Sequence, residues 1–195
     1  MAEPRDAKAP RRDLLLAAGG LAMSGGPAAA AAGGLGNAFE AAIEAIEGGP
    51  LDMRAFRGRP LLVVNTASFC GYTPQFASLE RLHRRFGSRG LVVLGVPSND
   101  FNQESPDARA IRQFCEANYD VTFPMTMPAH VRGPEAHPLF AFLAERGGGP
   151  PRWNFHKYLV ARDGRAVRGF PTRVEPEAPE MLRAIEAALA APAGA

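Results

Sequence analysis

The chain has 195 residues, of which 46% are hydrophobic and 22% are charged, and its formal net charge is +2. This length can bury one well-packed core but is short for two. The near-neutral charge argues against a nucleic-acid-binding protein, which usually presents a strongly basic face. The sequence also contains no apolar run of about 18 residues, so it predicts no membrane-spanning helix.

The first 32 residues differ in composition from the rest. Arg11 and Arg12 precede a short apolar stretch, which ends in small residues including the alanines at 28–32. This order is typical of a bacterial export signal, and the paired arginines resemble a twin-arginine signal. We therefore expect a cleaved signal at 1–32, a single domain at 33–195 and a periplasmic mature protein. A disordered low-complexity leader is the alternative.

The next segments predict a short N-terminal element and then a parallel strand–helix–strand unit. Residues 39–53 suit either a helix, from "FEAAIEAIE", or a hairpin around "EGGP". "LLVVNTAS" (61–68) and "LVVLGVPS" (91–98) are continuous apolar runs typical of strands buried on both faces. Between them, apolar side chains at helical spacing predict a helix over 75–86.

The second half of the chain predicts mixed elements. They are a helix over 107–118, a strand over 121–127, a short helix over 137–147, a hairpin over 153–170 with Asp163-Gly164 as its turn, and a final helix over 179–190. One parallel unit followed by an antiparallel hairpin predicts an α/β fold. The economical arrangement is a mixed sheet of four or five strands with helices on both faces, as in the thioredoxin-like fold.

Cys70 lies where a strand ends and a helix begins, in "ASFCGYTPQF". A thiol there faces unpaired backbone N–H groups and the positive end of the helix dipole, which both stabilise the thiolate. At a loop tip, the sulfur is expected to be accessible to an oxidant. The sequence Cys-Gly-Tyr-Thr has no nearby second cysteine, which argues against a dithiol exchanger or a zinc site. From these residues alone, a buried and inert Cys70 remains equally open.

Two other stretches bear on Cys70. Gln103 follows the second predicted strand, and Trp153-Asn154 opens a later one. Because ligands of open α/β sheets bind outside the carboxyl ends of the strands, Cys70 and Gln103 should converge on one edge. Taken singly, however, Trp153 would be a core residue, and Gln103 and Asn154 would be ordinary turn residues.

Four ordered stretches carry a specific resemblance. They are "VVNTASFCGYTPQF" (63–76), "LVVLGVPSNDFNQE" (91–104), "IRQFCEANYDVTFPMT" (111–126) and "WNFHKYLV" (153–160). Together they resemble the glutathione peroxidase family in its cysteine-containing, thioredoxin-type form. The resemblance implies a thioredoxin-like fold with an N-terminal β-hairpin over 39–53. It also implies a peroxidatic Cys70 with Gln103, Trp153 and Asn154 around the sulfur.

The resemblance also implies how the enzyme turns over. Cys70 would reduce hydrogen peroxide or an organic hydroperoxide and become a sulfenic acid. Cys115 matches the resolving cysteine of members that are reduced by thioredoxin, so we expect an intramolecular disulfide. The segment 143–155 is short where tetrameric, glutathione-using members carry an insertion, so with Cys115 it favours a monomer and a thioredoxin-like reductant rather than glutathione. Since a disulfide requires Cα atoms within about 7 Å, the helix around Cys115 should unwind during turnover. Cys115 as a small core residue, or a purely structural disulfide, stays open.

No cofactor or metal site is expected, because the four histidines show no ligand spacing with each other or with the cysteines. Two other functions stay open. A peroxide sensor would use the same Cys70 chemistry to pass its disulfide to a client protein, and sustained turnover with a general reductant would separate the two. A non-enzymatic thioredoxin-fold module, such as a copper chaperone, is disfavoured because the sequence lacks a Cys-x-x-x-Cys motif.

Overall fold

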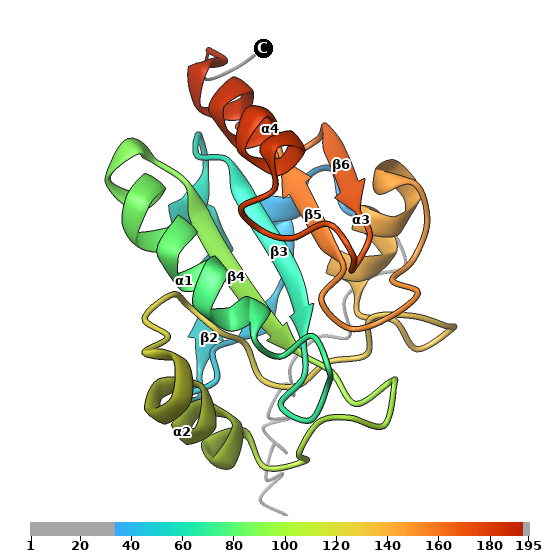
Figure 1. Cartoon of the computed structure of the whole chain (residues 1–195). Helices are drawn as coiled ribbons and strands as arrows, with labels where there is room; N and C mark the ends of the chain where they lie inside the picture. The colour runs from blue at the N-terminus through green and yellow to red at the C-terminus, as the bar shows by residue number, and fades with distance from the viewer. Residues whose placement is uncertain (1–33, 193–195) are drawn as a thin grey trace, which may run out of the picture. The chain divides into compact units, whose positions relative to one another are not determined.

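The computed structural model describes residues 34–192 (Figure 1). The export signal expected over residues 1–32 lies outside this described part. The strands are β1 (Ile43–Glu44), β2 (Pro50–Leu51), β3 (Leu61–Thr66), β4 (Val92–Pro97), β5 (Lys157–Val160) and β6 (Val167–Phe170). The α-helices are α1 (Gln75–Phe86), α2 (Ala108–Tyr119), α3 (Pro138–Gly147) and α4 (Pro179–Ala190).

The central sheet has four strands in the order β4-β3-β5-β6. Strands β3 and β4 are parallel, with Leu61 opposite Val92, and α1 connects them. Strand β5 runs antiparallel to both β3 and β6. The β5–β6 turn is closed by Asp163, whose carboxylate accepts a hydrogen bond from the backbone N–H of Arg165 (2.8 Å). The predicted parallel unit and the predicted hairpin are both confirmed.

The structure contains the hairpin at 39–53 but not the strand predicted over 121–127. Strands β1 and β2 pair antiparallel, so residues 39–53 contain the hairpin and not the alternative helix. The strand predicted over 121–127 is wrong, because this segment makes only two isolated bridges, Gly95 with Met125 and Ala45 with Thr126. Pro124 has no N–H group to continue a ladder, which explains why the pairing stops there.

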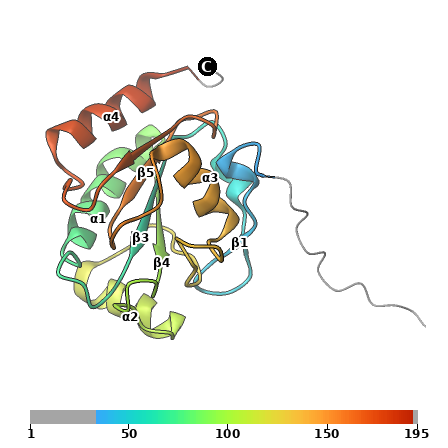
Figure 2. The same cartoon turned by 90° about the vertical axis from the view of Figure 1, so that its right-hand side faces the viewer.

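Helices cover both faces of the sheet, with α1 and α4 on one side and α3 on the other (Figure 2). Alternate residues of β3 point to opposite faces. Leu62 and Val64 pack with α1 and α4, whereas Leu61 and Val63 pack with α3. None of the helices in the described part has the length and apolar character needed to cross a bilayer.

The close approach of α3 to β6 requires glycine. A Cβ atom at Gly169 would overlap the carbonyl oxygen of Gly147, the last residue of α3. We expect Gly169→Ala to lower the free energy of unfolding by about 1–3 kcal/mol in urea titrations, because the helix must shift to make room. Gly71→Ala is the control, since a Cβ there meets nothing within 4 Å. Equal losses in both variants would contradict this packing argument.

Candidate active site

Cys70 lies in a tight loop between β3 and α1. The hydroxyl of Thr73 accepts a hydrogen bond from the Cys70 N–H (3.1 Å) and donates one to the carbonyl of Ala67 (2.9 Å). The backbone N–H of Tyr72 donates to the Cys70 sulfur across 3.4 Å. This bond places a backbone donor at the sulfur, within the loop that precedes α1.

Cys70 is a largely buried residue. Only 7% of the residue is exposed, so of the two alternatives that the residues leave open, an accessible or a buried Cys70, the structure has the buried one. The contact of Thr73 with Ala67 folds the loop back on itself and directs Cys70 towards the core. Its neighbours Phe69 and Tyr72 are instead 67% and 38% exposed. The loop thus buries most of Cys70 and presents two aromatic residues to solvent.

Gln103 and Asn154 meet directly. The side-chain amide of Asn154 donates to the side-chain oxygen of Gln103 across 2.9 Å, and Asn154 is fully buried. The carbonyl of Gln103 also accepts a hydrogen bond from the backbone N–H of Phe69 (3.0 Å), the residue before Cys70. The structure therefore joins the three loops that carry Cys70, Gln103 and Asn154.

Trp153 is a surface residue and not the core residue that its type alone suggests. It is 41% exposed, and its ring centroid lies 5.3 Å from that of Phe101, two positions before Gln103. The guanidinium of Arg132 lies 4.7 Å from the centroid of the same phenyl ring. These ring contacts hold the indole beside the Gln103 loop and leave part of it exposed to solvent.

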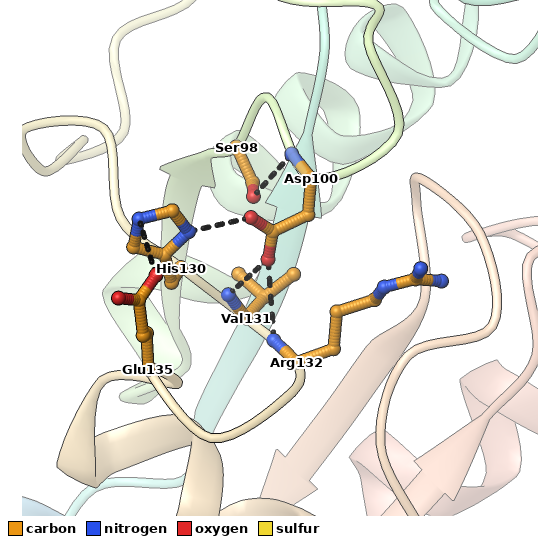
Figure 3. Close-up of polar contacts among 6 residues, drawn as sticks. All are labelled: Ser98, Asp100, His130, Val131, Arg132 and Glu135. Atoms are coloured by element: carbon orange, nitrogen blue, oxygen red, sulfur yellow. Dashed lines mark hydrogen bonds and ion pairs between the residues drawn. The ribbon is translucent and has the colours of Figure 1, made fainter.

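The Gln103 loop is anchored through Asp100, a residue that the sequence analysis did not single out (Figure 3). The Asp100 carboxylate accepts hydrogen bonds from the backbone N–H groups of Val131 (2.7 Å) and Arg132 (3.2 Å), and it pairs with Nδ1 of His130 (2.7 Å). This hydrogen bond raises the pKa of His130 above its ordinary value. The two backbone bonds do not depend on the charge of His130, so the anchor remains when the imidazole is neutral.

Cys115 is fully buried on α2, and both cysteines are free. Burial raises the pKa of the Cys115 thiol to about 12, and the negative charge of Glu104 adds to this effect. The rings of Phe69 and Phe114, which precede the two cysteines, lie 6.5 Å apart between centroids. Figure 1 shows α2 at the sheet edge where β3 and β4 end, next to the loop that carries Cys70. The two thiols thus lie on neighbouring elements, but Cys115 is protonated and enclosed.

Glu104 is a second residue that the sequence analysis missed. It is only 6% exposed, and its Oε1 accepts a hydrogen bond from the backbone N–H of Ser105 (2.8 Å). Its Oε2 is buried, and contacts with the Ser68 side chain and backbone offset part of the cost of burying the carboxyl. Burial raises the pKa of this carboxyl above its ordinary value of 4.5. A charged Glu104 therefore destabilises the folded state.

This carboxyl gives a prediction about stability. A folded-state pKa above the unfolded value means that the folded protein binds the proton more tightly, so stability falls as pH rises through the folded pKa. We expect Glu104→Gln to raise the free energy of unfolding at pH 7, with a gain that shrinks towards pH 4.5. Urea titrations at both pH values measure it, and Glu116→Gln on the exposed face of α2 is the control. A less stable Glu104→Gln at pH 7 would contradict the argument.

The candidate site brings the loop of Cys70 together with loops that carry the side-chain amides of Gln103 and Asn154 and the indole of Trp153. Within residues 34–192, no three histidine, cysteine or acidic side chains are arranged to hold a metal ion. A thiol on the loop before the first helix of a thioredoxin-like sheet, joined to loops with uncharged hydrogen-bonding groups, is typical of a thiol-based oxidoreductase.

The family follows from comparison with known proteins. The sequence model described as "Glutathione peroxidase" matches residues 38–144. The chain therefore belongs to the glutathione peroxidase family and is a peroxidase. The resemblance predicted from the four sequence stretches is confirmed.

Relatives and solved structures agree with this family. Hydroperoxy fatty acid reductase gpx1 of Synechocystis sp. is 44% identical over 144 residues, which cover 68% of this chain and 85% of the relative. Glutathione peroxidase-like peroxiredoxin gpx1 of Schizosaccharomyces pombe is 40% identical over 136 residues, covering 67% and 86%. The apo crystal structure of Trgpx has a TM-score of 0.66 at 30% identity and covers 80% of this chain and 98% of that one. The T. cruzi GPX1 structure has a TM-score of 0.63 at 26% identity and covers 78% and 96%.

Proposed function

We propose that this peroxidase is a monomer that reduces hydrogen peroxide and organic hydroperoxides through Cys70 and is recycled by a thioredoxin-like protein. The observation that carries the proposal is the Cys70 sulfur, which faces the Tyr72 N–H on a loop bonded to that of Gln103. Relatives named as a hydroperoxy fatty acid reductase and a glutathione peroxidase-like peroxiredoxin support the substrate class and the type of reductant.

In the first step, the Cys70 thiolate attacks the terminal oxygen of the hydroperoxide. A sulfur–oxygen bond forms as the O–O bond breaks, the sulfur is oxidised to a sulfenic acid, and the peroxide leaves as an alcohol or water after taking a proton. Negative charge moves from sulfur to the departing oxygen. The amides of Gln103 and Asn154 and the indole N–H of Trp153 are neutral donors for that charge, each contributing about 3 kcal/mol by analogy with oxyanion-hole donors.

In the second step, the Cys115 thiol attacks the sulfur of the Cys70 sulfenic acid. A disulfide forms and water leaves, and a dithiol reductant then restores both thiols by becoming a disulfide itself. Because Cys115 is fully buried and protonated, α2 must open before this attack. Only two of the twelve residues of α2 are buried, Ile111 and Cys115, which supports such local opening.

Mass spectrometry tests both steps on the reduced protein before and after one equivalent of hydrogen peroxide. We expect a sulfenate at Cys70 followed by a Cys70–Cys115 disulfide. Supplying thioredoxin or glutathione in parallel then tests the reductant, and faster turnover with glutathione would contradict that part of the proposal. Sustained turnover would also argue against a peroxide sensor that uses its disulfide only on a client protein.

We also propose that the protein is exported to the periplasm, with residues 1–32 as a twin-arginine-type signal and 33–195 as the mature domain. The order of basic, apolar and small residues supports this location. N-terminal sequencing of the exported protein tests it. We expect a new terminus near Ala32, whereas an intact Met1 or Ala2 would contradict export by this signal.

A further inference from the structure

The turn that carries Trp153 and Asn154 contains an unfavourable backbone conformation. Phe155 has a φ angle of 59°, in the left-handed region that bulky residues rarely adopt. Its ring is fully buried and packs edge-on against Phe76 of α1, with the centroids 5.3 Å apart. A conformation of this kind persists only where surrounding contacts hold it, and such positions concentrate at functional sites.

Asn65 of β3 holds the turn on both sides of Phe155. Its side-chain amide donates to the carbonyl of Trp153 (3.2 Å), and its side-chain oxygen accepts from the N–H of His156 (3.0 Å). Its own backbone carbonyl accepts from the N–H of Phe155 (2.7 Å). Asn65 is fully buried, so these bonds form away from competing water.

Thr172 fixes the backbone of the turn at Asn154. Its hydroxyl donates to the carbonyl of Asn154 across 2.7 Å. Its own carbonyl accepts from the side chains of Gln75 (2.9 Å), the first residue of α1, and Lys157 (3.1 Å). Through Thr172, the backbone of Asn154 is therefore connected to the start of the helix that follows Cys70.

Because both side chains bind the backbone of the turn, they determine where the indole of Trp153 and the amide of Asn154 lie. We propose that Asn65 and Thr172 are positioning residues for the reaction of Cys70 with peroxide, a role that rests on the proposed function of Cys70. They act through Trp153 and Asn154 and not by contact with the peroxide. Small displacements of such groups can lower a rate by up to about a hundredfold.

Thr172 offers a matched pair of variants. Thr172→Val keeps the shape but removes the hydroxyl, and Thr172→Ser keeps the hydroxyl. We expect the valine variant to lower the rate of Cys70 sulfenate formation about tenfold and the serine variant to stay within about twofold of the wild type. Quenched-flow trapping with dimedone, followed by mass spectrometry, measures this rate in the full chain.

A remote threonine separates positioning from general loss of stability. Thr126 is fully buried and donates a comparable hydrogen bond to the carbonyl of Met127 (2.8 Å). We expect Thr126→Val to lower stability in urea about as much as Thr172→Val while changing the sulfenate rate by less than about twofold. If both variants slow oxidation in proportion to their lost stability, the role of Thr172 is structural and the proposal is wrong.

A double-mutant cycle tests whether Thr172 acts through Asn154. In an Asn154→Ala background, adding Thr172→Val should change the rate by less than about threefold, because the amide that Thr172 positions is already absent. An undiminished tenfold loss there would overturn the proposal. Asn65→Ala should slow oxidation of Cys70 by more than Thr172→Val does. If the Asn65→Ala protein does not fold, the comparison of Thr172→Val with Thr172→Ser tests the proposal.

The wild-type protein in the same series distinguishes a failure of the proposed function from a failure of the positioning role. If its Cys70 fails to form a sulfenate with peroxide, the proposed function is wrong and the positioning role falls with it. If wild-type Cys70 is oxidised and Thr172→Val is oxidised equally fast, only the positioning role is wrong.

Discussion

Replacing Cys70 by serine is expected to lower peroxide reduction by about 10⁴-fold or more, because a serine hydroxyl remains protonated and cannot attack an O–O bond. Serine has nearly the same shape as cysteine, and its oxygen can accept the hydrogen bond that the Tyr72 N–H makes to sulfur. The fold should therefore persist, with a change in unfolding free energy of about 1 kcal/mol or less. A coupled assay with thioredoxin and its reductase measures the rate, and circular dichroism checks the fold.

Cys115→Ser is the matched control for this result. It changes the only other cysteine of the chain and leaves Cys70 in place. We expect it to form the Cys70 sulfenate within about twofold of the wild-type rate, since Cys115 takes no part in the attack on peroxide. Peroxide reduction in Cys70→Ser above about 1% of wild type would show that another group is the nucleophile.

Replacing Cys115 by alanine is expected to lower steady-state turnover with thioredoxin by about a hundredfold while the first oxidation of Cys70 proceeds normally. Without a resolving thiol, the sulfenic acid has no intramolecular partner and accumulates. In mass spectra of this variant, the sulfenate at Cys70 should persist, because no disulfide forms and no water is released from it. Turnover with thioredoxin at the wild-type rate would exclude Cys115 as the resolving residue.

The burial of Cys115 adds a second measurement to this prediction. With its pKa raised to about 12 in the folded state, the thiol ionises only when α2 opens and its pKa returns towards 9.0. Alkylation of Cys115 should therefore accelerate in urea concentrations too low to unfold the whole protein.

Asp107→Ala tests the opening of α2 by removing the cap at the start of this helix. The Asp107 carboxylate caps α2 by accepting hydrogen bonds from the backbone N–H groups of Arg109 (2.9 Å) and Ala110 (3.3 Å). Its loss should destabilise α2 by about 1 kcal/mol and speed both alkylation and disulfide formation about fivefold. Slower disulfide formation in this variant would mean that the resolving step needs an intact helix.

Much of the fold could be predicted because its signals are local. The apolar runs of β3 and β4, the helical spacing within α1 and the Asp163-Gly164 turn each lie within a few residues. The prediction was wrong at 121–127, where a strand-like composition is interrupted by Pro124. Residues 39–53 were ambiguous by pattern, because strands of two residues are too short to show one, and only the family resemblance predicted the hairpin.

The site was predictable in part. The loops of Cys70, Gln103 and Asn154 do meet, as the carboxyl-end argument and the family resemblance suggest. The residues alone left the burial of Cys70 open, because it depends on the contact of Thr73 with Ala67. The bonds from Asn65 to Trp153 and His156 span about ninety positions, and no local pattern reports contacts of that range.

The sparse burial of α2 has a consequence for protein engineering. Since α2 contributes only Ile111 and Cys115 to the buried interior, the layers on either side of the sheet do not depend on it for most of their packing. Substitutions that raise the melting temperature through the sheet, α1 or α4 should therefore leave the catalytic cycle as fast as before. Substitutions that rigidify α2 should yield a more heat-resistant but slower enzyme.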